Sequence, residues 1–208
     1  MIRVLVADDH AVVRAGITRI VREQPDFTVV GEASSVDEVM SACETTECEV
    51  VLLDVNMQGQ TSLEALKTIK AQKPSVAILV LSMYPEEQYA IRFLKAGASG
   101  YLTKEAAPDE LVAAIHRVAS GEHYLTPKLT EAVVFGDPAR TAAPHQALSD
   151  REYEVFLGLA HGKRIRDIAD ELPLSEKTVS TYRARVLRKL GCATNAELVS
   201  YAIERELL

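Results

Sequence analysis

The 208-residue sequence contains little cysteine and no long apolar run, and each shortage excludes a class of protein. Its three cysteines, Cys43, Cys48 and Cys192, include no C-x-x-C pair and lack the even number of a disulfide framework. No stretch approaches the roughly 18 to 20 apolar residues that a membrane span requires, and the first residues show no signal-peptide pattern. These shortages predict a cytoplasmic protein in a reducing environment, with no membrane partner.

Charge is distributed unevenly along the chain, whose formal net charge is −7. Residues 1–125 contain 11 Lys and Arg against 18 Asp and Glu, whereas residues 126–208 contain 12 of each. Within the second part, residues 176–191 carry five cations and the single acid Glu176. An acidic part followed by a part with a basic helix predicts two domains with different partners, the second a candidate for binding nucleic acid.

Short apolar, β-branched runs alternate with helical patterns through residue 120. Strands are expected at 2–7, 28–32, 50–54, 77–82 and 99–103, and helices at about 11–23, 36–45, 62–73, 87–96 and 108–120. Five β/α units predict an α/β fold, in which a five-stranded parallel, doubly wound sheet of the flavodoxin-like type has the strand order 2-1-3-4-5.

The rest of the chain has a linker and then only helical patterns. The linker collects Pro, Gly and small residues, with a short helix expected near 127–134. Four helices follow, the first starting at the S-x-x-E sequence of Ser149 and the second and third covering 165–172 and 176–190. They predict an all-α helix-turn-helix domain. The predicted domains are 1–121, the linker 122–147, and 148–208.

Four of the predicted strands end in polar residues, and the carboxyl ends of parallel strands meet at one edge of a sheet. These residues are Asp8 and Asp9, Asp54, Ser82 and Lys104. Three carboxylates in one crevice repel one another, and a hard cation such as Mg²⁺ relieves the repulsion while binding phosphate oxygens. One carboxylate can then attack a phosphoryl group whose oxygens contact the lysine and the serine. The set predicts a magnesium-dependent phosphoryl site.

Several segments of the first domain occur together in a known family. They are Val-Leu-Val-Ala-Asp-Asp-His (4–10), Val-Leu-Leu-Asp-Val-Asn-Met (51–57), Val-Leu-Ser-Met (80–83) and Lys-Ala-Gly-Ala-Ser-Gly-Tyr-Leu-Thr-Lys (95–104). With them, the domain resembles the receiver domain of bacterial two-component response regulators. The resemblance implies that Asp54 accepts phosphate from the phosphohistidine of a sensor histidine kinase.

The same resemblance implies roles for the neighbours of the acceptor. Asp9, Asp54 and the backbone carbonyl of Asn56 would hold Mg²⁺, with Asp8 acting through water. Ser82 and Tyr101 would rearrange together on phosphorylation, although Tyr101 also fits an ordinary core position.

Two loop positions depart from the usual receiver pattern, which reads Met-Pro-Gly after the acceptor and Ser-Gly before the third helix. This chain has Met57-Gln58-Gly59 and Thr61-Ser62 instead. Without the proline the loop gains conformational freedom in the unfolded chain. Because no charged group of the pocket is replaced, we expect the chemistry to survive and the autodephosphorylation rate to change.

The helix expected at 176–190 has one apolar side and one small, polar and basic side when residues are placed at 100° steps. Val179, Val186 and Leu190 form the apolar side. Such a helix can enter the major groove and contact bases and phosphates, although an ordinary bundle helix would show the same pattern. The residues expected to contact DNA are Lys177, Ser180, Thr181, Ala184, Arg185, Arg188 and Lys189.

The segments Leu-Ser-Asp-Arg-Glu-Tyr-Glu-Val (148–155), Ile-Ala-Asp-Glu-Leu (168–172), Leu-Ser-Glu-Lys-Thr-Val (174–179) and Arg-Lys-Leu-Gly (188–191) are similar to the LuxR-type DNA-binding domain. Together with the receiver they resemble the NarL/FixJ family. This implies a transcription regulator, with no separate enzyme activity, that is phosphorylated on Asp54 and binds double-stranded DNA as a homodimer. Two alternatives are a magnesium-dependent phosphohydrolase with Asp54 as nucleophile, and a constitutive DNA-binding protein with a vestigial receiver.

Overall fold

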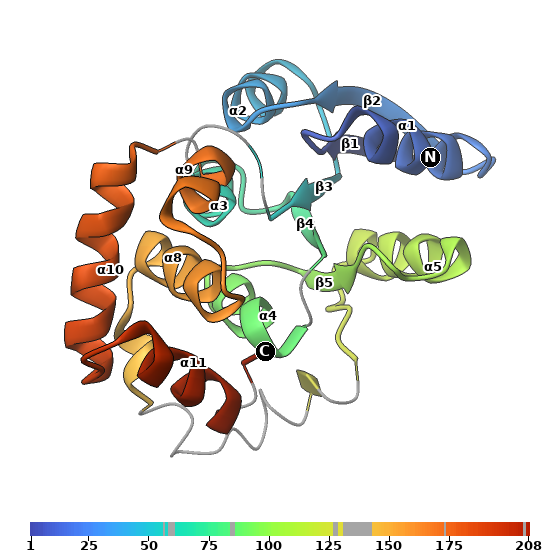
Figure 1. Cartoon of the computed structure of the whole chain (residues 1–208). Coiled ribbons are helices and arrows are strands. Elements are labelled where there is room, and N and C mark those ends of the chain that lie inside the picture. Colours follow the sequence, from blue (N-terminus) through green and yellow to red (C-terminus); the bar gives the residue numbers. More distant parts are fainter. Residues whose placement is uncertain are drawn as a thin grey trace. The chain divides into compact units, whose positions relative to one another are not determined.

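The chain forms two compact units, residues 1–130 and 131–208, in a computed structural model (Figure 1). The structure describes residues 1–55, 57, 61–83, 86–126, 129–130, 143–172, 174–205 and 207–208. Most of the helix expected at 127–134 and much of the expected linker lie outside these residues. Across the described ranges, no helix combines the length and the apolar character needed to span a membrane.

The first unit is a five-stranded parallel sheet with flanking helices (Figure 1). Its strands are β1 (Ile2–Ala7), β2 (Phe27–Ala33), β3 (Val50–Asp54), β4 (Ala77–Ser82) and β5 (Gly100–Thr103). Its helices are α1 (Ala11–Arg22), α2 (Val36–Thr45), α3 (Ser62–Gln72), α4 (Glu86–Lys95) and α5 (Pro108–Ala119). The strand order is β2-β1-β3-β4-β5, with every neighbouring pair parallel, so the predicted fold class and strand order are confirmed.

The central strands β3 and β4 are buried along their whole length. Alternate residues of β1, β3 and β4, among them Val4, Leu52 and Leu79, pack against Val21 of α1 and Ile115 of α5. Helices α2 and α3 contact each other, as do α1 and α5. Because helices cover both faces, continuous apolar runs are favourable in these strands, and their polar residues are confined to the strand ends.

The chain beyond α5 stays attached to the sheet, past the predicted domain limit at residue 121. Tyr124 forms a β-bridge with Gly100, and its backbone N–H donates to Ser99 O at 2.9 Å. Its hydroxyl donates to Glu110 Oε1 of α5 at 2.9 Å. The segment that follows α5 therefore adds backbone hydrogen bonding to the edge of β5.

The second unit consists of a short 3₁₀ helix and four α-helices. They are η1 (Pro144–Ala147), α8 (Asp150–Ala160), α9 (Ile165–Glu171), α10 (Glu176–Leu190) and α11 (Asn195–Glu204). The expected capping box at the start of α8 is present, since Ser149 Oγ accepts from Glu152 N and Ser149 N donates to Glu152 Oε2. Gly191 ends α10 in the left-handed conformation, with φ 70°.

The short helix η1 lies in the segment that the sequence assigned to the linker. Its His145 is 4% exposed, and the ring Nδ1 lies 2.9 Å from the hydroxyl of Tyr201 on α11. The second unit therefore contains ordered residues before 148. The limits at 121 and 148 remain predictions, and both contacts favour wider domains.

Two glycines distinguish tight packing from open space in the first unit. A Cβ at Gly100 would lie 2.9 Å from the backbone oxygen of Tyr124, whereas a Cβ at Gly16 of α1 meets nothing within 4 Å. We expect Gly100→Ala to lower the free energy of unfolding by about 1–3 kcal/mol and Gly16→Ala to raise it by roughly 0.5–1 kcal/mol. Urea unfolding of the full chain measures both. Equal effects of the two substitutions would contradict the close approach of Tyr124 to β5.

Candidate functional site

Asp8 is held rigidly at the carboxyl end of β1. Its side chain is fully buried, and its backbone N–H donates to Ala33 O of β2 at 3.0 Å. Its Oδ1 accepts from the backbone N–H of His10 at 2.8 Å, and Arg14 Nη1 donates to its backbone oxygen at 2.6 Å. These contacts fix where the second carboxylate oxygen points.

One buried ammonium joins the ends of three strands. Lys104 Nζ, just after β5, lies 2.7 Å from Asp8 Oδ2 and 2.9 Å from Asp54 Oδ2. The three side chains are only 7%, 0% and 2% exposed, respectively. The backbone N–H of Lys104 donates to Ser82 O of β4 at 2.7 Å, which fixes the root of the lysine. The structure thus brings together the polar strand ends that the sequence predicted to converge.

The carboxylates outnumber the lysine in this pocket, which gives it the donor set of a metal site. Asp8, Asp9, His10 and Asp54 each offer a ligand atom, and these atoms all lie within 4.8 Å of one another. Asp9 is 20% exposed, and its Oδ1 lies 2.7 Å from His10 Nδ1. Three carboxylates facing one ammonium leave an excess of negative charge, which a divalent cation with oxygen ligands would offset. The predicted ligand Asn56 lies outside the described residues.

Ser82 and Tyr101 are both buried beside the pocket. Ser82 ends β4 and is paired in register with Thr103, one residue before Lys104. Tyr101 is 1% exposed and lies opposite Val80. Ser82 therefore lies at the same sheet edge as Asp54, while Tyr101 lies two residues further back on β5.

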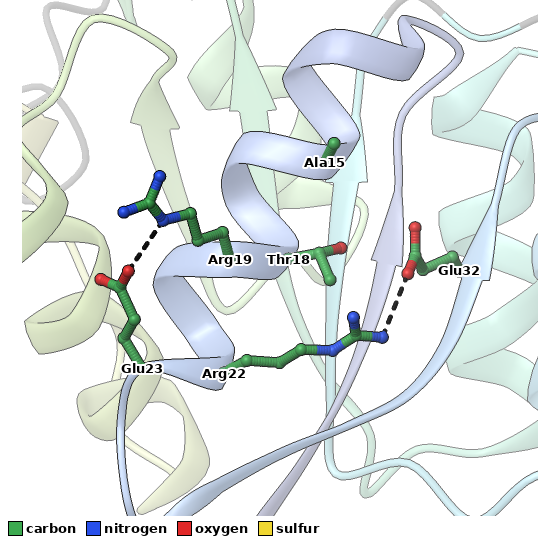
Figure 2. A pocket seen from close by; sticks show the side chains of 6 residues that line it. All are labelled: Ala15, Thr18, Arg19, Arg22, Glu23 and Glu32. Carbon is green, nitrogen blue, oxygen red and sulfur yellow. Dashed lines mark hydrogen bonds and ion pairs between the residues drawn. The ribbon is translucent and has the colours of Figure 1, made fainter.

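A shallow hollow on the outer side of α1 is a different feature (Figure 2). Its arginines already face carboxylates, since Arg19 Nε lies 2.8 Å from Glu23 Oε1 and Arg22 Nη2 lies 3.4 Å from Glu32 Oε1 (Figure 2). None of the pocket residues described above lines it. Balanced surface charge gives this hollow no preference for phosphate.

The helix α10 presents the two faces that the sequence predicted. Val179, Val186, Leu187 and Leu190 are buried. Residues 177, 180, 181, 184, 185, 188 and 189, which were expected to contact DNA, are all exposed. The exposed side of α10 is thus small, polar and basic, as a helix entering the major groove requires.

Comparison with known proteins adds a family to this geometry. The model of the response regulator receiver domain matches residues 4–116, and that of bacterial regulatory proteins of the luxR family matches residues 146–202. The chain is a two-component response regulator with a LuxR-type DNA-binding domain. Both matched families are regulators rather than enzymes. The predicted resemblance to NarL/FixJ-type response regulators is confirmed.

Named relatives cover the whole of this response regulator. It is 38% identical over 209 residues to response regulator UvrY of Escherichia coli strain K12, covering 100% of this chain and 96% of the relative. It is 35% identical over 210 residues to response regulator GacA of Pseudomonas aeruginosa, covering 100% and 98%. A structure of RcsB from Salmonella enterica serovar Typhimurium, bound to promoter rprA with phosphomimetic BeF3⁻, matches with TM-score 0.66 and 27% identity over 97% of this chain and 98% of that one.

Lys189 has a structural contact in the response regulator that its sequence did not reveal. Its Nζ lies 2.5 Å from Glu152 Oε2 and donates to Ala147 O at 3.2 Å. Burial raises the pKa of the Glu152 carboxyl, but hydrogen bonds from Lys189 and Ser149 together hold that pKa below its usual range. A DNA phosphate would have to compete with this carboxylate for the lysine, so Lys189 differs from the other exposed cations of α10.

His10 and Arg14 are the pocket residues that sequence reasoning missed. His10 directly follows the two aspartates, and this adjacency was a usable signal. Arg14 lies one turn into α1, and nothing in the sequence indicates that its guanidinium returns to the end of β1.

Removing the buried ammonium should destabilise the receiver unit. In Lys104→Gln two buried carboxylates face each other without a cation, so we expect the free energy of unfolding to fall by about 3–5 kcal/mol in metal-free buffer. Added Mg²⁺ should restore part of the loss because it binds the folded state. Urea unfolding with and without Mg²⁺ measures both effects. Arg19→Gln, which removes an exposed ion pair, is the control and should change little; an equally small loss for Lys104→Gln would refute the pairing.

Substitution of two lysines of α10 should separate folding from DNA binding. Lys189→Met keeps the aliphatic stem but strands Glu152, so it should lower the stability of the second unit by roughly 1–2 kcal/mol after screening at the partly exposed lysine is allowed for. Lys177→Met should weaken DNA affinity and leave stability unchanged. Thermal unfolding and a DNA-binding titration distinguish them.

The stability effect of Lys189→Met should also depend on pH. The folded pKa of Glu152 is below its unfolded value, so its contribution is complete above about pH 4.3 and is lost as the pH falls through the folded pKa. The stability difference between wild type and variant should therefore narrow toward pH 3. A difference that stays constant with pH would show that the ion pair is not its cause.

Proposed function

We propose that a sensor histidine kinase phosphorylates this response regulator on Asp54, and that the phosphoryl group controls homodimerisation and sequence-specific binding to promoter DNA. The observation that carries the proposal is the buried triad in which Lys104 Nζ lies 2.9 Å from Asp54 Oδ2 and 2.7 Å from Asp8 Oδ2. It places a carboxylate nucleophile and a phosphate-binding ammonium at one point.

Asp8, Asp9 and Asp54, with the backbone carbonyl of Asn56, would hold Mg²⁺. When bound, the ion offsets the charge that a phosphoryl group adds to an acidic pocket. The oxygen-rich donor set formed by the three carboxylates fits a hard cation of this kind. His10 lies at the exposed rim, with 68% of its side chain accessible.

The side chains of the pocket have separate roles in phosphoryl transfer. An Asp54 carboxylate oxygen forms the new bond to phosphorus as the bond from phosphorus to the kinase histidine nitrogen breaks. Lys104, which Asp8 orients, neutralises one phosphoryl oxygen, and the Ser82 hydroxyl donates to another. Because Asp8 is fixed by three backbone contacts, Lys104 is oriented before the phosphoryl group arrives.

The same contacts give the phosphoryl group a route to the surface of the receiver. A hydrogen bond from Ser82 to the phosphoryl group pulls the end of β4, and the 2.7 Å bond between Lys104 N and Ser82 O couples β4 to β5. Tyr101 on β5 then repacks with Ser82, and the equilibrium between closed and DNA-competent arrangements shifts. Methyl-sized changes matter here because both side chains are buried.

DNA binding is proposed for the exposed side of α10. Ser180, Thr181 and Ala184 are small enough to approach base edges, and Lys177, Arg185 and Arg188 supply contacts to phosphates. One such helix covers few base pairs, so paired half-sites and a homodimer are expected. Among structures similar to this chain, one shows two RcsB dimers bound to two parallel DNAs, with TM-score 0.59 and 26% identity.

Incubation with acetyl phosphate and Mg²⁺ followed by intact-mass measurement tests the proposal. We expect a gain of one phosphoryl group in the wild type and in Asp37→Asn, an exposed control on α2, and no gain in Asp54→Asn. Promoter affinity should rise with phosphorylation only where the mass gain occurs. Multiple turnovers of free phosphate on small substrates would favour a phosphohydrolase, and tight DNA binding without incorporation would favour a vestigial receiver; either result would contradict the proposal.

A further inference from the structure

Two of the three cysteines lie together at the opposite edge of the sheet from the phosphoryl pocket. Cys43 lies in the last turn of α2, and Cys48 lies two residues before β3. Both are buried, with 3% and 8% exposure, and the Cys43 thiol hydrogen bonds to the Cys48 sulfur. The chain reverses between them after Thr46, which brings residues five apart into side-chain contact.

Cations surround the pair and make the two thiols unequal. Lys73, at the end of α3, donates its ammonium to the backbone oxygen of Cys43. The hydrogen bond from Cys43, against the effect of burial and aided by the charges of Lys73 and Arg3, lowers the pKa of Cys48 to about 7. The same hydrogen bond and burial raise the pKa of Cys43. A thiolate on Cys48 therefore lies beside a protonated thiol on Cys43.

Other uses of two adjacent cysteines fit less well. A soft metal ion needs further ligands, and the neighbouring groups are the cations Lys73 and Arg3, which repel it. Packing alone accounts for two buried small side chains but not for the charge asymmetry between them. A low-pKa thiolate next to a second thiol is instead the arrangement of a reactive cysteine with a resolving partner.

We propose that Cys43 and Cys48 are a redox modification site that forms a reversible intramolecular disulfide when a hydroperoxide oxidises the protein. The Cys48 thiolate attacks one peroxide oxygen, so that a sulfur–oxygen bond forms, the oxygen–oxygen bond breaks, and hydroxide leaves to become water. The Cys43 sulfur then attacks the sulfenic sulfur; the disulfide forms, the sulfur–oxygen bond breaks, and the departing hydroxide takes the Cys43 proton as water. Two thiols and one hydrogen peroxide give one disulfide and two waters, and an external dithiol reverses the change.

The disulfide would pin the end of α2 to the start of β3. That start is already anchored, because Arg3 N donates to Glu49 Oε2 at 3.0 Å and Ala77 N donates to Glu49 O at 2.9 Å. Asp54 lies at the other end of β3, so the site is chemically separate from phosphoryl transfer and its existence does not depend on the proposed function.

The test uses the full chain with Cys192→Ser, which removes the third thiol. The reduced protein is treated with hydrogen peroxide, denatured, alkylated with N-ethylmaleimide and weighed intact. We expect both alkylatable thiols to disappear together with the loss of two hydrogens, and dithiothreitol to restore both. Cleavage after Glu44 and Glu47 should yield peptides joined through Cys43 and Cys48.

Serine variants in the same background identify the attacking thiol. Without Cys43, Cys48 should accumulate as a sulfenic acid that dimedone traps; without Cys48, Cys43 should react with peroxide at least about tenfold more slowly. The proposal is overturned if both thiols stay alkylatable at peroxide concentrations that oxidise Cys48 in Cys43→Ser. Disulfides found only between chains would overturn it equally.

Discussion

The receiver unit depends on a lysine ammonium buried between two aspartates from different strands. Lys104 lies within hydrogen-bonding distance of Asp8 and Asp54, and all three side chains are nearly inaccessible to water. Burying such charges is costly unless each has a partner, so the ends of β1, β3 and β5 must stay in register for the pocket to exist. The fold and the chemistry therefore impose the same geometric constraint.

The parallel sheet supplies that geometry from simple sequence patterns. Apolar runs fill strands covered on both faces, and polar residues collect where each strand ends. The excess of carboxylates over cations at that edge then creates a site for a divalent ion and a phosphoryl group. On α10, by contrast, the apolar side packs inward and the exposed side keeps its charge for DNA, so the two units divide sensing from reading.

Sequence reasoning predicted what periodicity and strand ends determine, and missed what loops determine. The strand order, the convergence of Asp8, Asp54 and Lys104, and the buried side of α10 followed from alternation and from 100° steps. The returning side chain of Arg14, the pairing of Cys43 with Cys48 and the contacts of Lys189 depend on how the chain turns between elements. Spacing alone does not encode those turns, because each is set by tertiary packing.

The most direct test of the central claim is to locate the phosphoryl group. After treatment with acetyl phosphate and Mg²⁺, borohydride reduces an aspartyl phosphate to homoserine, and peptide mass spectrometry identifies the reduced position. The account predicts homoserine at position 54 alone, with the signal lost in Lys104→Gln. Homoserine at position 8 or 9, or none in a folded protein supplied with Mg²⁺, would contradict it.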